Sequence, residues 1–157
     1  MRRLVNDEKA VSLSIGFILT FSITVLMLVI ILTSFYSLMD RAEQTVMRDE
    51  FEIHGSDLAV KITTIDTMAG TAISSGATVG EIRYDVSLPE RIAGKHYTIE
   101  LSNATNEIII SSEERDETRV KVPFSTNDTT VLSTTLHSPK GEFRIVYYPD
   151  TNTIEMS

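Results

Sequence analysis

The sequence contains no cysteine, no tryptophan and only 4 prolines in 157 residues. The lack of cysteine excludes disulfide bonds, thiolate metal sites and a cysteine nucleophile. Basic residues are also few, because 14 Lys and Arg stand against 22 Asp and Glu, for a formal net charge of −8. This acidic balance argues against a nucleic-acid-binding surface, so nucleic acid is not an expected partner. The length allows one folded domain with one appendage.

Charge is absent from one long segment of the chain. The 30 residues from Ala10 to Met39 contain no Asp, Glu, Lys or Arg. A helix rises about 1.5 Å per residue, so the segment would reach about 45 Å, more than the roughly 30 Å hydrocarbon core of a bilayer. A cleavable secretory signal has a shorter apolar stretch of about 7 to 15 residues. We therefore predict a retained, single-pass transmembrane helix.

The charges on the two sides of this segment predict its orientation. Arg2, Arg3 and Lys9 precede it, whereas the chain after Met39 has 11 basic and 20 acidic residues, a formal charge of −9. Lys and Arg next to a membrane helix tend to stay in the cytoplasm. We expect the N-terminus inside the cell and an acidic C-terminal domain outside the membrane.

A motif marks the start of the apolar segment, where residues 7–19 read DEKAVSLSIGFIL. This run resembles the start of archaeal type IV pilin-like precursors, in which a charged leader (a class III signal peptide) precedes a pattern close to AVSPVIGVILM. The resemblance implies that a prepilin-type peptidase cuts after Lys9 and Ala10, leaving Val11 as the first mature residue. Leu13 stands where that pattern has proline, which favours a minor pilin or a pilin-like membrane protein over a major adhesion pilin.

The resemblance covers about 30 residues and also implies an architecture. Ser12, Ile15 and Gly16 match the core of the family's pattern, and the family implies a β-rich extracytoplasmic head. The implied partners are the membrane and other pilin-like subunits, identical or different. The implied location is the cell membrane or an extracellular filament.

Two alternatives to a cut leader remain open. Asp7, Glu8 and Lys9 also fit a polar cap before an uncut helix, because a helix dipole favours acidic residues at its start. The protein would then be a permanent anchor whose β head binds a surface-layer protein or an archaellum component. An accessory subunit of a membrane enzyme is a further alternative, which rests on the anchor alone.

Small and hydroxyl residues lie near the start of the apolar segment. Ser12, Ser14, Gly16 and Thr20 recur at spacings of two to four, which lets helices of other copies approach closely. We predict that Ser12, Ile15, Gly16 and Thr20 pack against such helices. The alternative is that these hydroxyls are tolerated in any single-span anchor, since they can bond back to their own helix.

The helical pattern continues after Asp40. One row of apolar residues at intervals of seven is Val46, Ile53 and Val60, and a second is Phe51, Leu58 and Ile65. No proline precedes Pro89, so we predict one continuous helix to Ala69, with Gly55 as a candidate bend. The glycine-containing stretch 70–80 is the predicted linker.

Beyond the linker the apolar period drops to two, which predicts about seven short strands. They are expected at 82–88, 97–101, 107–112, 120–124, 129–136, 142–148 and 153–156. The predicted fold class is α+β, a long N-terminal helix followed by a small antiparallel β-sheet or β-sandwich head. Phe51, Leu58, Ile62 and Ile65 are the candidates that cover one sheet face. The predicted domains are a leader (1–10), a transmembrane helix (11–39), a stalk helix (40–69), a linker (70–80) and the β domain (81–157).

Candidate chemistry in the head is sparse. Two sequons, Asn103-Ala104-Thr105 and Asn127-Asp128-Thr129, fall on predicted turns and are candidate N-glycosylation sites or merely polar turns. No catalytic, cofactor or metal site is expected, because no nucleophile elbow, phosphate loop or zinc-binding helix motif occurs. His54, His96 and His137 are interpreted as surface or packing residues, with no partner carboxylate or second histidine at ligand spacing. The cluster 113–117 is expected to be a solvated hairpin tip rather than a calcium site.

Overall fold

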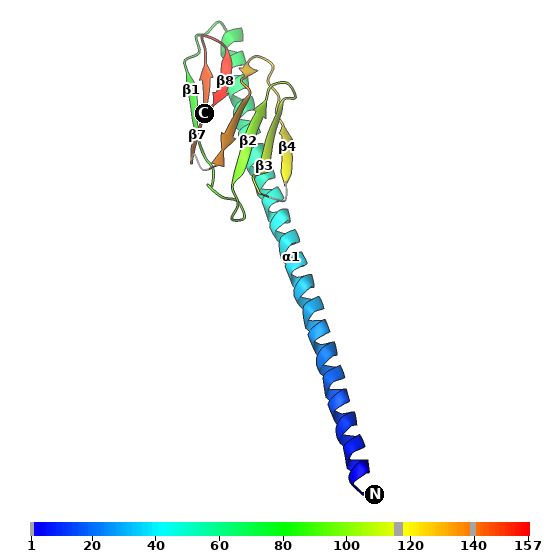
Figure 1. Cartoon of the computed structure of the whole chain (residues 1–157). Coiled ribbons are helices and arrows are strands. Elements are labelled where there is room, and N and C mark those ends of the chain that lie inside the picture. The colour runs from blue at the N-terminus through cyan, green and yellow to red at the C-terminus, as the bar shows by residue number, and fades with distance from the viewer. Residues whose placement is uncertain (1, 115–117, 139–140) are drawn as a thin grey trace. The chain divides into compact units, whose positions relative to one another are not determined.

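The computed structural model describes residues 2–114, 118–138 and 141–157, with side chains described from Ser14 onward. The layout is α+β, one long helix followed by small sheets that are mainly antiparallel (Figure 1). The chain divides into two compact units, Met1–Ala42 and Glu43–Ser157. The elements are α1 (Arg2–Ser74), β1 (Ile82–Ser87), β2 (Tyr97–Ser102), β3 (Glu107–Ser112), β4 (Arg119–Pro123), β5 (Thr130–Val131), β6 (Thr134–His137), β7 (Glu142–Tyr148) and β8 (Thr153–Met156).

The second unit, which we call the head (Glu43–Ser157), contains two four-stranded sheets. Their strand orders are β1-β7-β8-β5 and β4-β3-β2-β6. All pairs are antiparallel except β5 with β8, which is parallel. Alternate residues point inward, so Ile99 lies opposite Ile110 in the core of one sheet and Ile145 lies opposite Met156 in the other. Strand pairing therefore produces the apolar faces that the head must bury.

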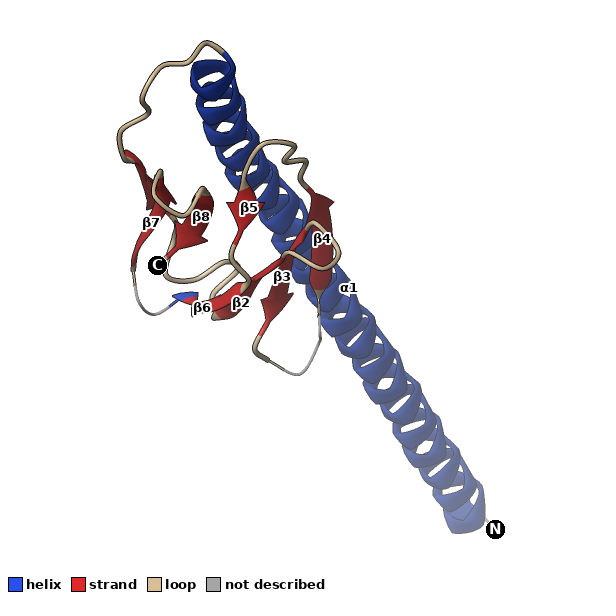
Figure 2. Ribbon diagram, turned by 90° about the horizontal axis from the view of Figure 1, so that it is seen from above, coloured by secondary structure: helices blue, strands red, loops and turns tan. Residues whose placement is uncertain are grey.

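The C-terminal part of α1 supplies the cover for these faces. Phe51, Leu58, Ile62 and Ile65 are each at most 1% exposed, which confirms the predicted covering residues. The Phe51 ring lies 5.6 Å from the Tyr97 ring of β2, centroid to centroid. Figure 2 shows this end of α1 beside both groups of strands. The stalk segment is thus part of the head's hydrophobic core.

Two glycines allow close packing between α1 and the rest of the head. A Cβ added to Gly55 would lie 2.7 Å from Val122 Cγ2, and one added to Gly70 would lie 2.0 Å from Asp128 Oδ2. Both positions are inside α1. Gly55, expected as a candidate bend, therefore serves as a contact point, because only a residue without a Cβ leaves room for the facing side chain.

The helix ends at Ser74, five residues beyond the end expected from the sequence. Gly76 has a φ of 72° and donates its N–H to the Ile73 carbonyl, while Ala77 donates to the Ala72 carbonyl. This pair of bonds is the Schellman arrangement that satisfies the last carbonyls of a helix. The second glycine of the 70–80 stretch, not the first, ends the helix.

The segment expected as one strand over 129–136 forms two. Val131 of β5 pairs with Ile154 of β8, whereas Leu136 of β6 pairs with Ile99 of β2. The chain thus leaves one sheet and enters the other between these residues. The described part of the head consequently has eight strands in two sheets, whereas about seven were expected.

Candidate assembly surface and modification turns

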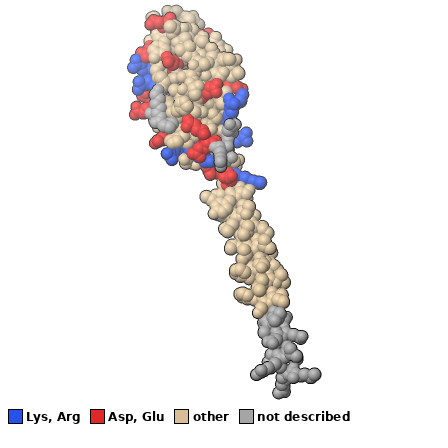
Figure 3. All heavy atoms as spheres, viewed as in Figure 1, with Lys and Arg blue, Asp and Glu red and all other residues tan. Residues whose placement is uncertain are grey.

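The N-terminal part of α1 is compatible with a membrane anchor. From Ser14 onward it is long and apolar enough to cross a bilayer, and its apolar side chains are exposed. Figure 3 shows charged side chains gathered on the head, and no Asp, Glu, Lys or Arg occurs between Ser14 and Met39. A large apolar surface is unfavourable in contact with water, so lipid or other helices must cover it.

The predicted helix-packing residues present an open surface in the single chain. Ile15 is 61% exposed, and no heavy atom lies within 4 Å of a Cβ added to Gly16. Thr20 donates its hydroxyl to the Gly16 carbonyl at 2.9 Å, so this hydroxyl is satisfied within the helix. The side chains of Ser12 and of the predicted processing residues Lys9, Ala10 and Val11 lie outside the described part of the chain.

A second apolar surface lies on the head's own part of α1. Val46, Ile53 and Val60 are 52%, 61% and 64% exposed, and we call them the outer row. Ile53 lies two positions after the buried Phe51, and Val60 lies two positions after the buried Leu58. Two residues are separated by about 200° around a helix, which places them on opposite sides. The two heptad rows recognised in the sequence therefore have opposite roles: one fills the core, and the other faces away from it.

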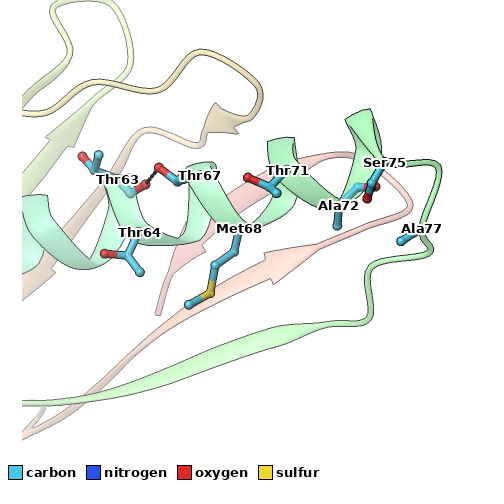
Figure 4. Close-up of a pocket in the computed structure, with 8 residues that line it drawn as sticks. All are labelled: Thr63, Thr64, Thr67, Met68, Thr71, Ala72, Ser75 and Ala77. Atoms are coloured by element: carbon cyan, nitrogen blue, oxygen red, sulfur yellow. Dashed lines mark hydrogen bonds between the residues drawn. The ribbon is translucent and has the colours of Figure 1, made fainter.

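Near its C-terminal end, α1 borders a hollow of about 580 Å³ (Figure 4). Thr64 donates its hydroxyl to the Val60 carbonyl at 2.7 Å, and Thr67 donates to the Thr63 carbonyl at 2.8 Å. Both hydroxyl groups therefore donate hydrogen bonds within the helix itself. The hollow is lined by hydroxyl, small and thioether residues without a titratable group, so it offers no acid or base for catalysis.

One buried carboxylate, Asp66, holds the segment before β5 against α1. Asp66 is 4% exposed and accepts bonds from the backbone N–H groups of Asn127, Asp128 and Thr129 at 2.9, 3.0 and 2.7 Å. The Thr129 hydroxyl donates to the same carboxylate at 2.8 Å. Burial by itself raises the pKa of Asp66, but these hydrogen bonds outweigh burial and leave the pKa below its usual value. We call this arrangement the Asp66 clamp.

The two sequons have different surroundings. Asn103, Ala104 and Thr105 are all exposed in the turn between β2 and β3. Asn127 is exposed as well, but Thr129 of its sequon is only 8% exposed and belongs to the Asp66 clamp. Sequence reasoning missed this difference, because Asp66 lies far from the sequon along the chain.

Two of the three histidines lie beside a carboxylate. His137 Nδ1 lies 2.9 Å from Glu113 Oε1, and His54 Nε2 lies 3.5 Å from Glu50 Oε2. Glu50 is one helical turn before His54, whereas Glu113 is brought to His137 by strand pairing. Within the described residues, no group of three His, Asp or Glu side chains is arranged to hold a metal ion. Residues 115–117 of the acidic cluster lie outside the described residues.

Comparison with known proteins gives a family. Residues 6–157 match DUF7266, a family of unknown function. The chain belongs to this family. No curated protein and no solved structure matches the chain. The match to DUF7266 covers the apolar segment and the head together.

Proposed function

We propose that this DUF7266 chain is a pilin-like structural subunit of an archaeal surface filament. A prepilin-type peptidase removes the residues before Val11, and the apolar helix then packs against the helices of other subunits. The head lies outside the cell membrane and carries N-linked sugar. The supporting sequence feature is the motif at residues 7–19, in which the charged residues 7–9 directly precede an uncharged helix.

The outer row is the structural observation that favours a filament subunit over a simple anchor. An anchor requires apolar residues only within the membrane, yet Val46, Ile53 and Val60 are exposed on the head's part of α1. Scattered single apolar residues on a surface are ordinary. Three at a regular interval of seven lie along one side of the helix and form an apolar seam on it. In the proposed filament, the helices of neighbouring subunits cover this seam.

Disruption of the outer row tests the proposal. The Ile53→Glu variant of the full-length protein should be made, inserted and processed normally but fail to enter filaments sheared from the cell surface. The head should remain folded, because Ile53 is 61% exposed and contributes little to the core. The amount of the protein in sheared and membrane fractions measures assembly.

Thr78→Glu is the matched control, because it places the same charge on an exposed residue of the loop after α1. It should assemble as the unchanged protein does. If Ile53→Glu enters filaments as efficiently as Thr78→Glu, or if the unchanged protein occurs only in the membrane fraction, the filament proposal is wrong.

A further inference from the structure

The two sequons differ in what the folded head makes available to a sugar-transferring enzyme. We propose that the folded protein carries its N-linked glycan on Asn103 and not on Asn127. This inference rests on the outward topology of the head in the proposed function, and it is independent of leader cleavage.

Asn103 lies in a turn that presents the whole sequon. The side chains of Asn103 and Thr105 are exposed, and neither forms a hydrogen bond to another described residue. The turn itself is held in place, because the Asn103 backbone N–H donates to Ser133 Oγ at 3.0 Å. An enzyme that reads Asn-X-Thr can therefore reach both the amide and the hydroxyl without opening the fold.

Asn127 exposes its amide but not the rest of its sequon. The Thr129 hydroxyl donates to Asp66 Oδ1, and the three backbone N–H groups of the sequon donate to the same carboxylate. Asp128 also packs against α1, because its carboxylate occupies the space beside Gly70. Presentation of Thr129 to an enzyme would break four hydrogen bonds and lift the segment off the helix.

The reaction needs one co-reactant, a lipid-linked oligosaccharide. The Nδ2 nitrogen of Asn103 forms a bond to the anomeric carbon of the sugar, and the bond from that carbon to the carrier's phosphate oxygen breaks. The phosphate leaves with the electron pair, and the amide loses one proton. No oxidant or reductant takes part.

Site occupancy in full-length protein from native membranes tests the inference. Mass spectrometry of proteolytic peptides should find sugar on the peptide with Asn103 and none on the peptide with Asn127. The Asn103→Gln variant should lose the whole glycan mass, and Asn127→Gln should keep it. Both substitutions replace exposed side chains, so the fold should tolerate them. Sugar on Asn127 at comparable occupancy, or an unmodified Asn103, would overturn the inference.

A second set of variants tests the clamp as the cause. Asp66→Ala should make sugar detectable on Asn127, because it removes the acceptor that holds Thr129. Asp57→Ala, which removes an exposed carboxylate paired with Lys61 on the same helix, should leave the occupancy of Asn127 unchanged. Leu58→Ala destabilises the core without touching the clamp and separates local release from general unfolding. Unchanged occupancy in Asp66→Ala, or an equal rise in Leu58→Ala, contradicts the clamp.

The same digests keep this inference separate from the proposed function. A retained leader together with sugar on Asn103 contradicts the proposed function and leaves the inference standing. A mature start at Val11 together with an unmodified Asn103 does the reverse.

Discussion

Asp66 is a single buried carboxylate that joins α1 to the segment before β5. A buried charge is costly unless hydrogen bonds compensate it, and here four donors converge on two oxygens. This role could not be predicted from the sequence, because an aspartate in an amphipathic helix usually faces water. Its donors lie 61 to 63 positions later, so only the tertiary fold shows that they meet.

Replacement of the carboxylate should weaken the head and alter its pH dependence. Asp66→Asn should lower the free energy of unfolding by about 2–3 kcal/mol at neutral pH, because charge-assisted bonds are lost. The folded-state pKa is depressed, so the contribution of Asp66 is complete above the unfolded-state pKa and is lost as pH falls through the folded-state pKa. The difference between the two proteins should therefore shrink below about pH 4.

Urea unfolding of the full-length protein in detergent measures this effect. Near-ultraviolet circular dichroism can follow the head, because Tyr97 and Tyr147 are each 1% exposed. Asp57→Asn, at an exposed position, is the control and should cost much less. A stability difference that grows on acidification would contradict the assigned hydrogen bonds.

Gly55 shows a similar limit of sequence reasoning. A glycine inside a helical pattern suggests a bend, whereas the structure requires it for close contact with Val122. Gly55→Val should lower head stability by about 1–3 kcal/mol, because the stiff side chain of Val122 has little freedom to move away.

Thermal unfolding of the two glycine variants separates these interpretations. Gly16→Val is the matched control, because no heavy atom lies near its added Cβ, and it should leave head unfolding unchanged. If Gly55→Val unfolds at the same temperature as the unchanged protein, the close contact does not limit packing at this position.

At the scale of elements, α1 was the part most predictable from sequence. Phe51, Leu58 and Ile65 recur at intervals of seven, which indicates one face of a helix, and all three residues are buried. Periodicity alone does not decide between the two rows, but the row predicted to cover a sheet face is the one that is buried. Relative burial depends on where the strands pack, and that information lies in residues 82–156.

The two rows predict opposite mutational costs. Leu58→Ala should destabilise the head by about 2–5 kcal/mol, because it removes buried methyl groups and leaves a cavity. Val60→Ala, at a residue that is 64% exposed, should change stability by no more than about 0.5 kcal/mol. Urea midpoints of the two variants provide the comparison. Equal losses would mean that the helix is rotated relative to the sheets described above.

The strands were predictable in approximate position but not in partnership, and the one expected over 129–136 forms two. Alternation of apolar residues indicates a strand but not the strand it pairs with. The passage of the chain from one sheet to the other between β5 and β6 could therefore not be predicted. Val131 pairs with β8 near the C-terminus, and Leu136 pairs with β2 in the other sheet. Such long-range pairings follow from the packing of the whole head.

At the scale of the whole molecule, electrostatic repulsion between heads should affect how closely they can approach one another. The chain after Met39 has a formal charge of −9, so neighbouring heads would repel each other in the proposed filament. Screening shortens this repulsion from about 30 Å at 0.01 M salt to about 10 Å at 0.1 M.

Assembly of detergent-purified protein should consequently increase with salt. We expect the concentration at which oligomers form to fall several-fold over that range, as measured by sedimentation. A nonionic osmolyte at equal osmolality is the control and should not reproduce the effect. Dissociation on addition of salt would indicate that ion pairs, rather than apolar rows, hold the subunits together.

Leader cleavage is the event that would turn a membrane anchor into an assembly subunit, so the mature N-terminus tests the central claim most directly. The measurement is N-terminal peptide mass spectrometry on protein from native membranes and from sheared surface material. We predict that the mature chain starts at Val11 in both fractions. Peptides that still contain Lys9 and Ala10 in protein from the cell surface would contradict the claim and identify a fixed anchor.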